Sequence, residues 1–202
     1  MTVRAPIEFW FDFSSGYAYL AACQIDALSA RVDRDVLWRP FMLGAAFKVT
    51  GMRGLSATPM KAEYARHDWA RAARRMGVDM ILPDGHPRIA LAATRAFYWV
   101  EHCYPERAAD FARAVFSAYY SGRLDTSDLD QVAGLGAQIG FDPAGLLAGA
   151  RSEEIRQAAI AASEAALACG VFGSPFFRVD GEGFWGWDRM VMMEDWLRTG
   201  GW

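Results

Sequence analysis

The chain has 202 residues, of which 53% are hydrophobic and 22% charged, and its formal net charge at pH 7 is −3. This composition excludes a disordered chain, because its apolar side chains offset the entropy lost on folding. The acidic balance argues against a general nucleic-acid-binding protein, which needs a basic face to neutralise phosphates. We therefore expect a small molecule or another protein as partner.

The N-terminal residues 1–9 fit neither a signal peptide nor a transit peptide, since Pro6 and Glu8 interrupt the apolar stretch. No uncharged apolar run approaches the roughly 18 residues that a membrane-spanning helix needs. We therefore expect a cytoplasmic protein that does not bind membranes.

The three cysteines are too far apart in the sequence to predict a disulfide framework or a pair of metal ligands. We expect all three to be reduced core residues: Cys23, Cys103 and Cys169. The histidines are equally scattered, so no metal site is expected.

The first 43 residues predict a strand, a helix and a second strand. The aromatic run 7–13 is typical of a strand that is buried on both faces. Apolar residues recur at helical spacing over 15–32, and 36–43 again has the character of a strand. The length of this unit is close to the minimum for a parallel crossover.

Residues 44–168 are expected to be almost entirely helical. Thr58 before Pro59 predicts a capped helix through residue 77, and Asp142 before Pro143 predicts a shorter helix by the same signal. Further helical patterns cover 87–104, 107–121, 126–138 and 151–168. Loop signals every ten to twenty residues or so favour a compact bundle over a coiled coil.

The C-terminal segment 170–190 predicts a hairpin and a last helix. "PFFRV" and "FWGW" flank "DGEG", whose residues tolerate positive φ, and a helix is expected to begin at Asp188. The resulting order, β, α, β, helical block, β, β, α, is that of an α/β thioredoxin-like fold with an inserted all-helical domain. We expect residues 1–43 and 169–202 to form the thioredoxin-like domain and 44–168 the insertion.

The stretch "FDFSSGYAYL", residues 11–20, places a helix start directly after the first strand. Free backbone N–H groups and the helix dipole favour an anion or a thiolate there. Thioredoxins carry a Cys-x-x-Cys pair at this point, but residues 15–18 read Ser-Gly-Tyr-Ala, which excludes disulfide exchange by this route.

The hydroxyl of Ser15 can instead donate a hydrogen bond to a thiolate that a cosubstrate brings. Lowering a thiol pKa by two units requires about 2.7 kcal/mol. A hydrogen bond to a charged group contributes about 1.5 to 3 kcal/mol and the helix dipole about 0.3 to 1. A serine at a helix start is also an ordinary cap, so the spacing alone leaves both roles open.

"FDFSSGYAYL" resembles the Phe-Asp-Phe-x-Ser-Pro-Tyr-x-Tyr-Leu opening of the 2-hydroxychromene-2-carboxylate isomerases and kappa-class glutathione transferases, which are glutathione-using relatives of DsbA-like oxidoreductases. The resemblance continues through "LGAAFKVTG", "TPMKAEYARHDWARAARRMG", "GVFGSPFF" and "FWGWDRM", so it covers nearly the whole chain. It implies a DsbA-like fold, glutathione as cofactor, a homodimer, and a catalytic Ser15 that faces the glutathione sulfur.

The resemblance also assigns residues that hold glutathione. It implies a cis bond before Pro175, with the backbone of Ser174 pairing to the cysteinyl part like an added strand. Asp188, aided by the backbone around Trp187, would hold the γ-glutamyl ammonium. The alternatives are a simple strand-entry proline and an ordinary helix cap.

Two departures from the family pattern concern the substrate. Gly16 stands where members usually have proline, and Met52 stands where they commonly have asparagine, whose amide hydrogen bonds methionine cannot supply. The cations Lys48, Arg53 and Lys61 are candidates for binding a carboxylate, although such side chains are often merely solvated. We assign Lys61 to glutathione, and Lys48, Met52 and Arg53 to the substrate.

The function that this pattern predicts is a glutathione-dependent cis-trans isomerase of 2-hydroxychromene-2-carboxylate or a related aromatic-degradation intermediate, acting by reversible thiolate addition. One alternative is a kappa-type glutathione transferase that releases its conjugate. Another is a non-catalytic module that binds glutathione or peptides. A serine hydrolase is a weaker alternative, because no Gly-x-Ser-x-Gly elbow is present.

Overall fold

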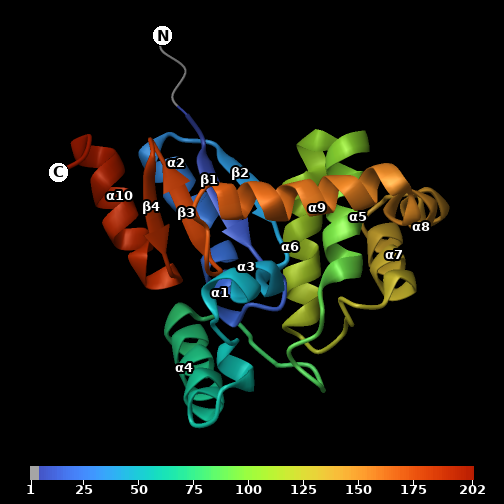
Figure 1. The fold of residues 1–202 in the computed structure, drawn as a ribbon, viewed down its shortest axis with the longest axis horizontal. Coiled ribbons are helices and arrows are strands. Elements are labelled where there is room, and N and C mark those ends of the chain that lie inside the picture. Colours follow the sequence, from blue (N-terminus) through green and yellow to red (C-terminus); the bar gives the residue numbers. More distant parts are fainter. Residues whose placement is uncertain (1–4) are drawn as a thin grey trace.

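The computed structural model describes residues 5–202, which form a four-stranded mixed sheet with the strand order β2-β1-β3-β4 (Figure 1). The strands are β1 (Ile7–Phe11), β2 (Val36–Pro40), β3 (Phe176–Val179) and β4 (Glu182–Trp185). β1 pairs in parallel with β2 and antiparallel with β3, and β4 pairs antiparallel with β3. The predicted parallel crossover and C-terminal hairpin are therefore confirmed.

Helices flank the sheet and form a bundle beside it. They are α1 (Gly16–Ala22), α2 (Ile25–Val32), α3 (Leu43–Thr50), α4 (Lys61–Met76), α5 (Leu91–Cys103), α6 (Ala108–Tyr119), α7 (Leu129–Gln138), α8 (Pro143–Arg151), α9 (Glu153–Ala168) and α10 (Met190–Thr199). Short 3-10 turns are η1 (Leu55–Ala57), η2 (Pro105–Arg107) and η3 (Trp187–Arg189). In Figure 1, α5 to α8 stand beside the sheet and α9 runs from this bundle toward the strands. None of the helices described is long and apolar enough to cross a membrane.

Aromatic side chains on both faces of β1 are buried, as the aromatic run 7–13 predicts. On one face Phe9 stacks on Phe177 with ring centroids 5.2 Å apart, and Trp38 meets Phe9 edge-on. Residues of α2 and α10 belong to this cluster. On the other face Trp10 and Phe176 pack with residues of α3 and α9. Burial of aromatic side chains on both sides fixes the register of β1.

Several predicted boundaries were wrong. The expected helix over 15–32 breaks at Cys23 and Gln24 into α1 and α2, without a glycine or proline to mark the break. The expected strand over 36–43 ends at Pro40, because α3 already begins at Leu43. Thr58 does not cap α4: its hydroxyl donates to the carbonyl of Gly54 (3.0 Å).

The cysteines are free, as expected, but they are exposed and not in the core. Their places in the helices explain this difference. Cys23 and Cys169 are the C-cap residues of α1 and α9, and Cys103 is the last residue of α5. All three therefore lie where a helix ends, and not on its buried face.

Candidate active site

The turn between β1 and α1 meets the start of β3, because β3 runs antiparallel to β1. The Ser15 hydroxyl donates to the backbone carbonyl of Ser174 (2.8 Å), and the N–H of Asp12 donates to Ser174 Oγ (2.8 Å). The Ser15 Oγ also accepts from the N–H of Ala18 (3.3 Å), so this residue caps α1. The bond between Ser174 and Pro175 is cis. The structure thus brings Ser15, Ser174 and Pro175 together.

The side chain of Asp12 fixes this turn through hydrogen bonds, a role that the sequence did not predict. Its carboxylate is buried and accepts from the N–H (2.9 Å) and the hydroxyl (2.7 Å) of Ser14 and from the N–H of Leu43 (3.0 Å). Burial raises the pKa of the Asp12 carboxyl, and the hydrogen bonds from Ser14 and Leu43 lower it. One feature of the sequence could have indicated this role: Asp12 is an acidic residue inside an aromatic run that otherwise reads as a strand. Asp12 fixes the start of α3 against the turn that carries Ser15.

Gly16 lets α4 approach the start of α1. A Cβ atom at this position would lie 2.7 Å from the ring of Trp69, so a larger residue would clash. The Tyr17 hydroxyl next to it donates to the carboxylate of Asp68 (2.7 Å). Glycine at this position, where the family pattern has proline, therefore allows α1 to pack closely on α4.

The residues expected to hold the γ-glutamyl group lie in η3, which contacts α1. Trp187 is half-buried and packs in a cluster with Tyr17, and the N–H of Gly186 donates to the carbonyl of Pro175 (3.0 Å). The exposed carboxylate of Asp188 pairs with Arg189 (3.0 Å). Asp188 lies within η3, and α10 begins only at Met190, so the expected helix start and cap at this residue were wrong.

The four remaining candidates lie along the segment from the end of α3 to the start of α4. Lys48 lies near the end of α3, Met52 and Arg53 follow it, and Lys61 begins α4. All four side chains are exposed. Within residues 5–202, no hydrogen bond or ion pair joins any of them to Ser15 or Ser174. Their assignment to substrate and glutathione stays a prediction.

A mixed sheet of this order, with a cis-proline opposite the cap residue of the helix after β1, defines a thioredoxin-like protein. The cap residue of this helix is Ser15. Residues 6–198 match the family model of the DSBA-like thioredoxin domain, and the chain belongs to that family.

Named relatives and solved structures agree with this fold. The chain is 28% identical over 197 residues to 2-hydroxychromene-2-carboxylate isomerase of Sphingobium xenophagum, covering 95% of this chain and 97% of the relative. A structure of selenomethionine 2-hydroxychromene-2-carboxylate isomerase superposes with a TM-score of 0.86 at 22% identity, over 96% of this chain and 94% of the other. The cytosolic disulfide reductase DsbM of Pseudomonas aeruginosa, solved with GSH, has a TM-score of 0.67 at 17% identity, with 96% of each chain covered.

Proposed function

We propose that the protein is a glutathione-dependent isomerase of 2-hydroxychromene-2-carboxylate or of a closely related unsaturated aromatic acid. The hydrogen bond between the Ser15 hydroxyl and the Ser174 carbonyl is the observation that carries this proposal. It supports a mechanism in which a serine hydroxyl at this turn meets a thiol that a cosubstrate brings. The relatedness to a named isomerase over nearly the full length of both chains supports the reaction class.

The residues at the turn fit a peptide that carries a thiol. No backbone group within residues 5–202 accepts from the N–H of Ser174, and its carbonyl accepts from a hydroxyl that can rotate. An extended peptide can therefore pair with both backbone groups of Ser174 as a strand does. The exposed carboxylate of Asp188 suits an ammonium group, and Lys61 suits a carboxylate. These residues match the two charged ends of glutathione.

Bound glutathione would supply a thiolate that adds reversibly to the unsaturated carbon, so that the former double bond becomes a single bond. The chromene ring opens as its hemiketal C–O bond breaks and the hydroxyl proton passes to the phenolic oxygen. Rotation about the single bond and loss of the thiolate then restore the double bond in the trans-benzylidenepyruvate. Ser15 stabilises the negative sulfur by turning its hydroxyl away from the Ser174 carbonyl. Asp12 keeps the turn in place through Ser14 and Leu43 while this hydroxyl reorients. Lys48 and Arg53 are the cations we assign to the carboxylate of the aromatic acid.

The first prediction tests Ser15 directly. Purified protein is mixed with glutathione and 2-hydroxychromene-2-carboxylate, and the absorbance of both isomers is followed. We expect interconversion that requires glutathione and falls about a hundredfold or more in Ser15→Ala, because a donor to a developing charge is lost. S-methylglutathione, which has no free thiol, should give no reaction.

Ser14→Ala is the matched control, since within residues 5–202 the Ser14 hydroxyl bonds to Asp12 and not to Ser174, and alanine keeps the backbone N–H bond to Asp12 that holds the turn. It should retain most of the activity. Interconversion without glutathione, or equal activity of Ser15→Ala and the wild type, would contradict the proposal.

A kappa-type glutathione transferase is the second candidate, because Met52 is exposed and offers no amide to hold the substrate in place. Loss of free thiol with a chlorinated aromatic electrophile, without interconversion of the isomers, would favour this activity. Quenching of tryptophan fluorescence by glutathione with neither activity would leave a binding module.

A further inference from the structure

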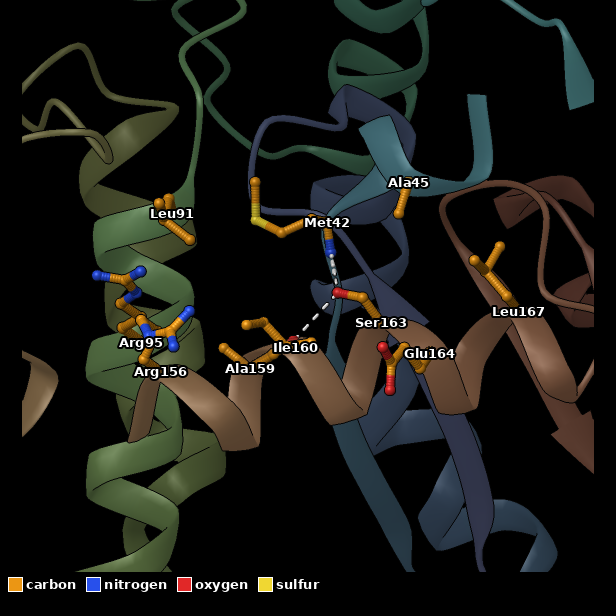
Figure 2. A pocket seen from close by; sticks show the side chains of 10 residues that line it. All are labelled: Met42, Ala45, Leu91, Arg95, Arg156, Ala159, Ile160, Ser163, Glu164 and Leu167. Carbon is orange, nitrogen blue, oxygen red and sulfur yellow. Dashed lines mark hydrogen bonds between the residues drawn. The ribbon is translucent and has the colours of Figure 1, made fainter. Parts of the chain in front are cut away.

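A cavity of about 300 Å³ lies between the start of α3 and the helices α5 and α9 (Figure 2). Met42 and Ala45 line it from α3 and the residue before it, and Leu91 and Arg95 line it from α5. One face of α9, from Arg156 to Leu167, forms the rest. The volume is at the lower end of the range for pockets that bind small molecules, about 300 to 1,000 Å³.

The body of this cavity is apolar and partly open to solvent. Met42 and Ile160 face each other across it in Figure 2, and Leu91 lies to their left. Leu91 and Ile160 are 37% and 39% exposed, which is high for large aliphatic side chains. A flat apolar group that enters the cavity would remove both side chains from water.

Arg95 brings a guanidinium group to one end of the cavity. Its Nε atom is buried, and it finds no hydrogen-bond acceptor within residues 5–202. Since Nε has no surface open to the cavity, a ligand would meet the two terminal nitrogens of the guanidinium, which form a planar fork that matches the two oxygens of a carboxylate.

Hydrogen bonds from Arg156 and Gln157, together with the nearby charge of Arg95, lower the pKa of the Glu153 carboxyl, but no ion pair joins Glu153 to Arg95 within residues 5–202. Glu153 already accepts from Arg156, with an Nε to Oε2 distance of 2.7 Å, and from Gln157 (2.8 Å). Glu164, which also lines the cavity, follows Arg156 by eight residues on α9, which is about 12 Å along the helix axis. Figure 2 shows Glu164 away from the end that holds Arg95 and Arg156. The guanidinium of Arg95 is therefore free to bind an anion from outside.

We propose that this cavity binds a small carboxylic acid with a flat apolar body, whose carboxylate sits on the fork of Arg95 and whose body packs against Met42, Leu91 and Ile160. The cavity lies beside the candidate active site, because the residue after Met42 is bonded to Asp12. Ser15 and Ser174 do not line it. The acid is either the aromatic substrate of the proposed reaction or a separate ligand of the same chemistry.

The test measures binding without glutathione, so that it does not depend on the proposed isomerase activity. The protein is titrated calorimetrically with 1-naphthoate and with neutral 1-naphthamide. The two compounds share the flat apolar body, so the difference in their affinities measures the contribution of the carboxylate. We expect naphthoate to bind at least about tenfold more tightly than the amide, since a hydrogen-bonded charge contributes more than about 1.4 kcal/mol. Arg95→Gln should abolish this difference.

Arg74→Gln is the matched control, because Arg74 is an exposed arginine of α4 that does not line the cavity. It should bind naphthoate as the wild type does. Ile160→Trp leaves Arg95 intact and fills the cavity from its exposed rim, and it should weaken naphthoate binding at least about tenfold. This variant keeps the test decisive even where Arg95→Gln proves poorly folded.

Equal binding of naphthoate and the amide, unchanged binding by both cavity variants, or no saturable binding of naphthoate at millimolar concentration would each overturn the proposal. The Ser15→Ala protein should bind naphthoate normally, so a failed isomerase assay leaves this site standing. In the isomerase assay, competitive inhibition by naphthoate and a raised KM in Arg95→Gln would identify the acid as the substrate. Binding of naphthoate without inhibition of the isomerase reaction would show that the cavity takes an acid other than the substrate.

Discussion

At the residue scale, His86 is a half-buried titratable group that packs near the candidate active site. Its Nδ1 lies 2.9 Å from the Tyr119 hydroxyl, which also accepts from the N–H of Arg88 (3.1 Å). Its ring meets Trp69 edge-on, with centroids 5.5 Å apart, and its Nε2 is buried without a partner within residues 5–202. Burial, aided by the charge of Arg66, lowers the pKa of His86 to about 4. The folded protein therefore keeps this imidazole neutral at pH 7.

This shift predicts a loss of stability in mild acid. The unfolded chain takes up the proton near pH 6.5 and the folded chain only near pH 4, so protonation favours unfolding between these values. The stability that His86 contributes is present above about pH 6.5 and is lost as the pH falls toward 4. Between pH 7 and 5 this amounts to up to about 2 kcal/mol.

Urea unfolding of wild type and His86→Phe at pH 7 and pH 5 measures this contribution. The variant should lose less stability between the two pH values than the wild type loses. His67→Gln, which removes an exposed histidine, should behave as the wild type. A His86→Phe protein with the full wild-type pH dependence would contradict the assignment.

Single residues of the site were predictable only where a local pattern marks them. Ser15 stands at a helix start that the sequence shows, and its cap is confirmed. Its second partner, Ser174, lies far along the chain, and only the family resemblance brought the two together. The contacts of Asp12 and Gly16 depend on α3 and α4, whose positions no local spacing indicates.

At the scale of elements, one sequence signal led to two different helix starts. Asp142 caps α8 as predicted, since its carboxylate accepts from the N–H groups of Ala144 (3.2 Å) and Gly145 (2.8 Å). Thr58 has the same relation to a following proline, but Met60 has a φ of 65° and α4 begins only after it. A backbone in the left-handed region cannot continue into the first turn of a helix.

The two positions should therefore respond differently to alanine. Asp142→Ala should lower the free energy of unfolding by about 1 kcal/mol, the usual cost of losing a side-chain cap. Thr58→Ala should lower it by less than about 0.5 kcal/mol, because no helix N–H loses its acceptor. Chemical denaturation of both variants checks this, and equal losses would show that Thr58 caps α4 in solution.

The types of the elements followed from hydrophobic periodicity, but their ends did not. The break at Cys23 and Gln24 interrupts an apolar pattern that would have continued as one helix. The end of β2 is decided by Asp12, whose carboxylate accepts from the N–H of Leu43 and so favours a helix there. Both boundaries are tertiary effects that override local propensity.

At the scale of the whole molecule, the sheet and the helical bundle share one hydrophobic cluster. Phe116 of α6 packs on Phe11 and Phe13 at the end of β1, with ring centroids 5.2 and 5.0 Å apart. The predicted division into residues 1–43 with 169–202 and an insertion of 44–168 stays a prediction. The shared core argues that the two parts unfold together, because neither can lose this contact without exposing aromatic surface of the other.

Phe116→Ala tests this cooperativity. Removing a buried phenylalanine costs about 3 to 5 kcal/mol, and we expect native-state hydrogen exchange to show the same loss of protection in β1 and in α5. Phe111→Ala is the matched control, because Phe111 is equally buried on α6 but meets Phe141 of the bundle. If the parts unfold as one, this variant lowers protection of β1 as well, although within residues 5–202 its side chain makes no ring contact with the sheet.

A rise of hydrogen exchange in α5 while β1 stays protected would contradict this expectation. It would mean that the helical bundle opens alone and that residues 44–168 behave as a separate domain.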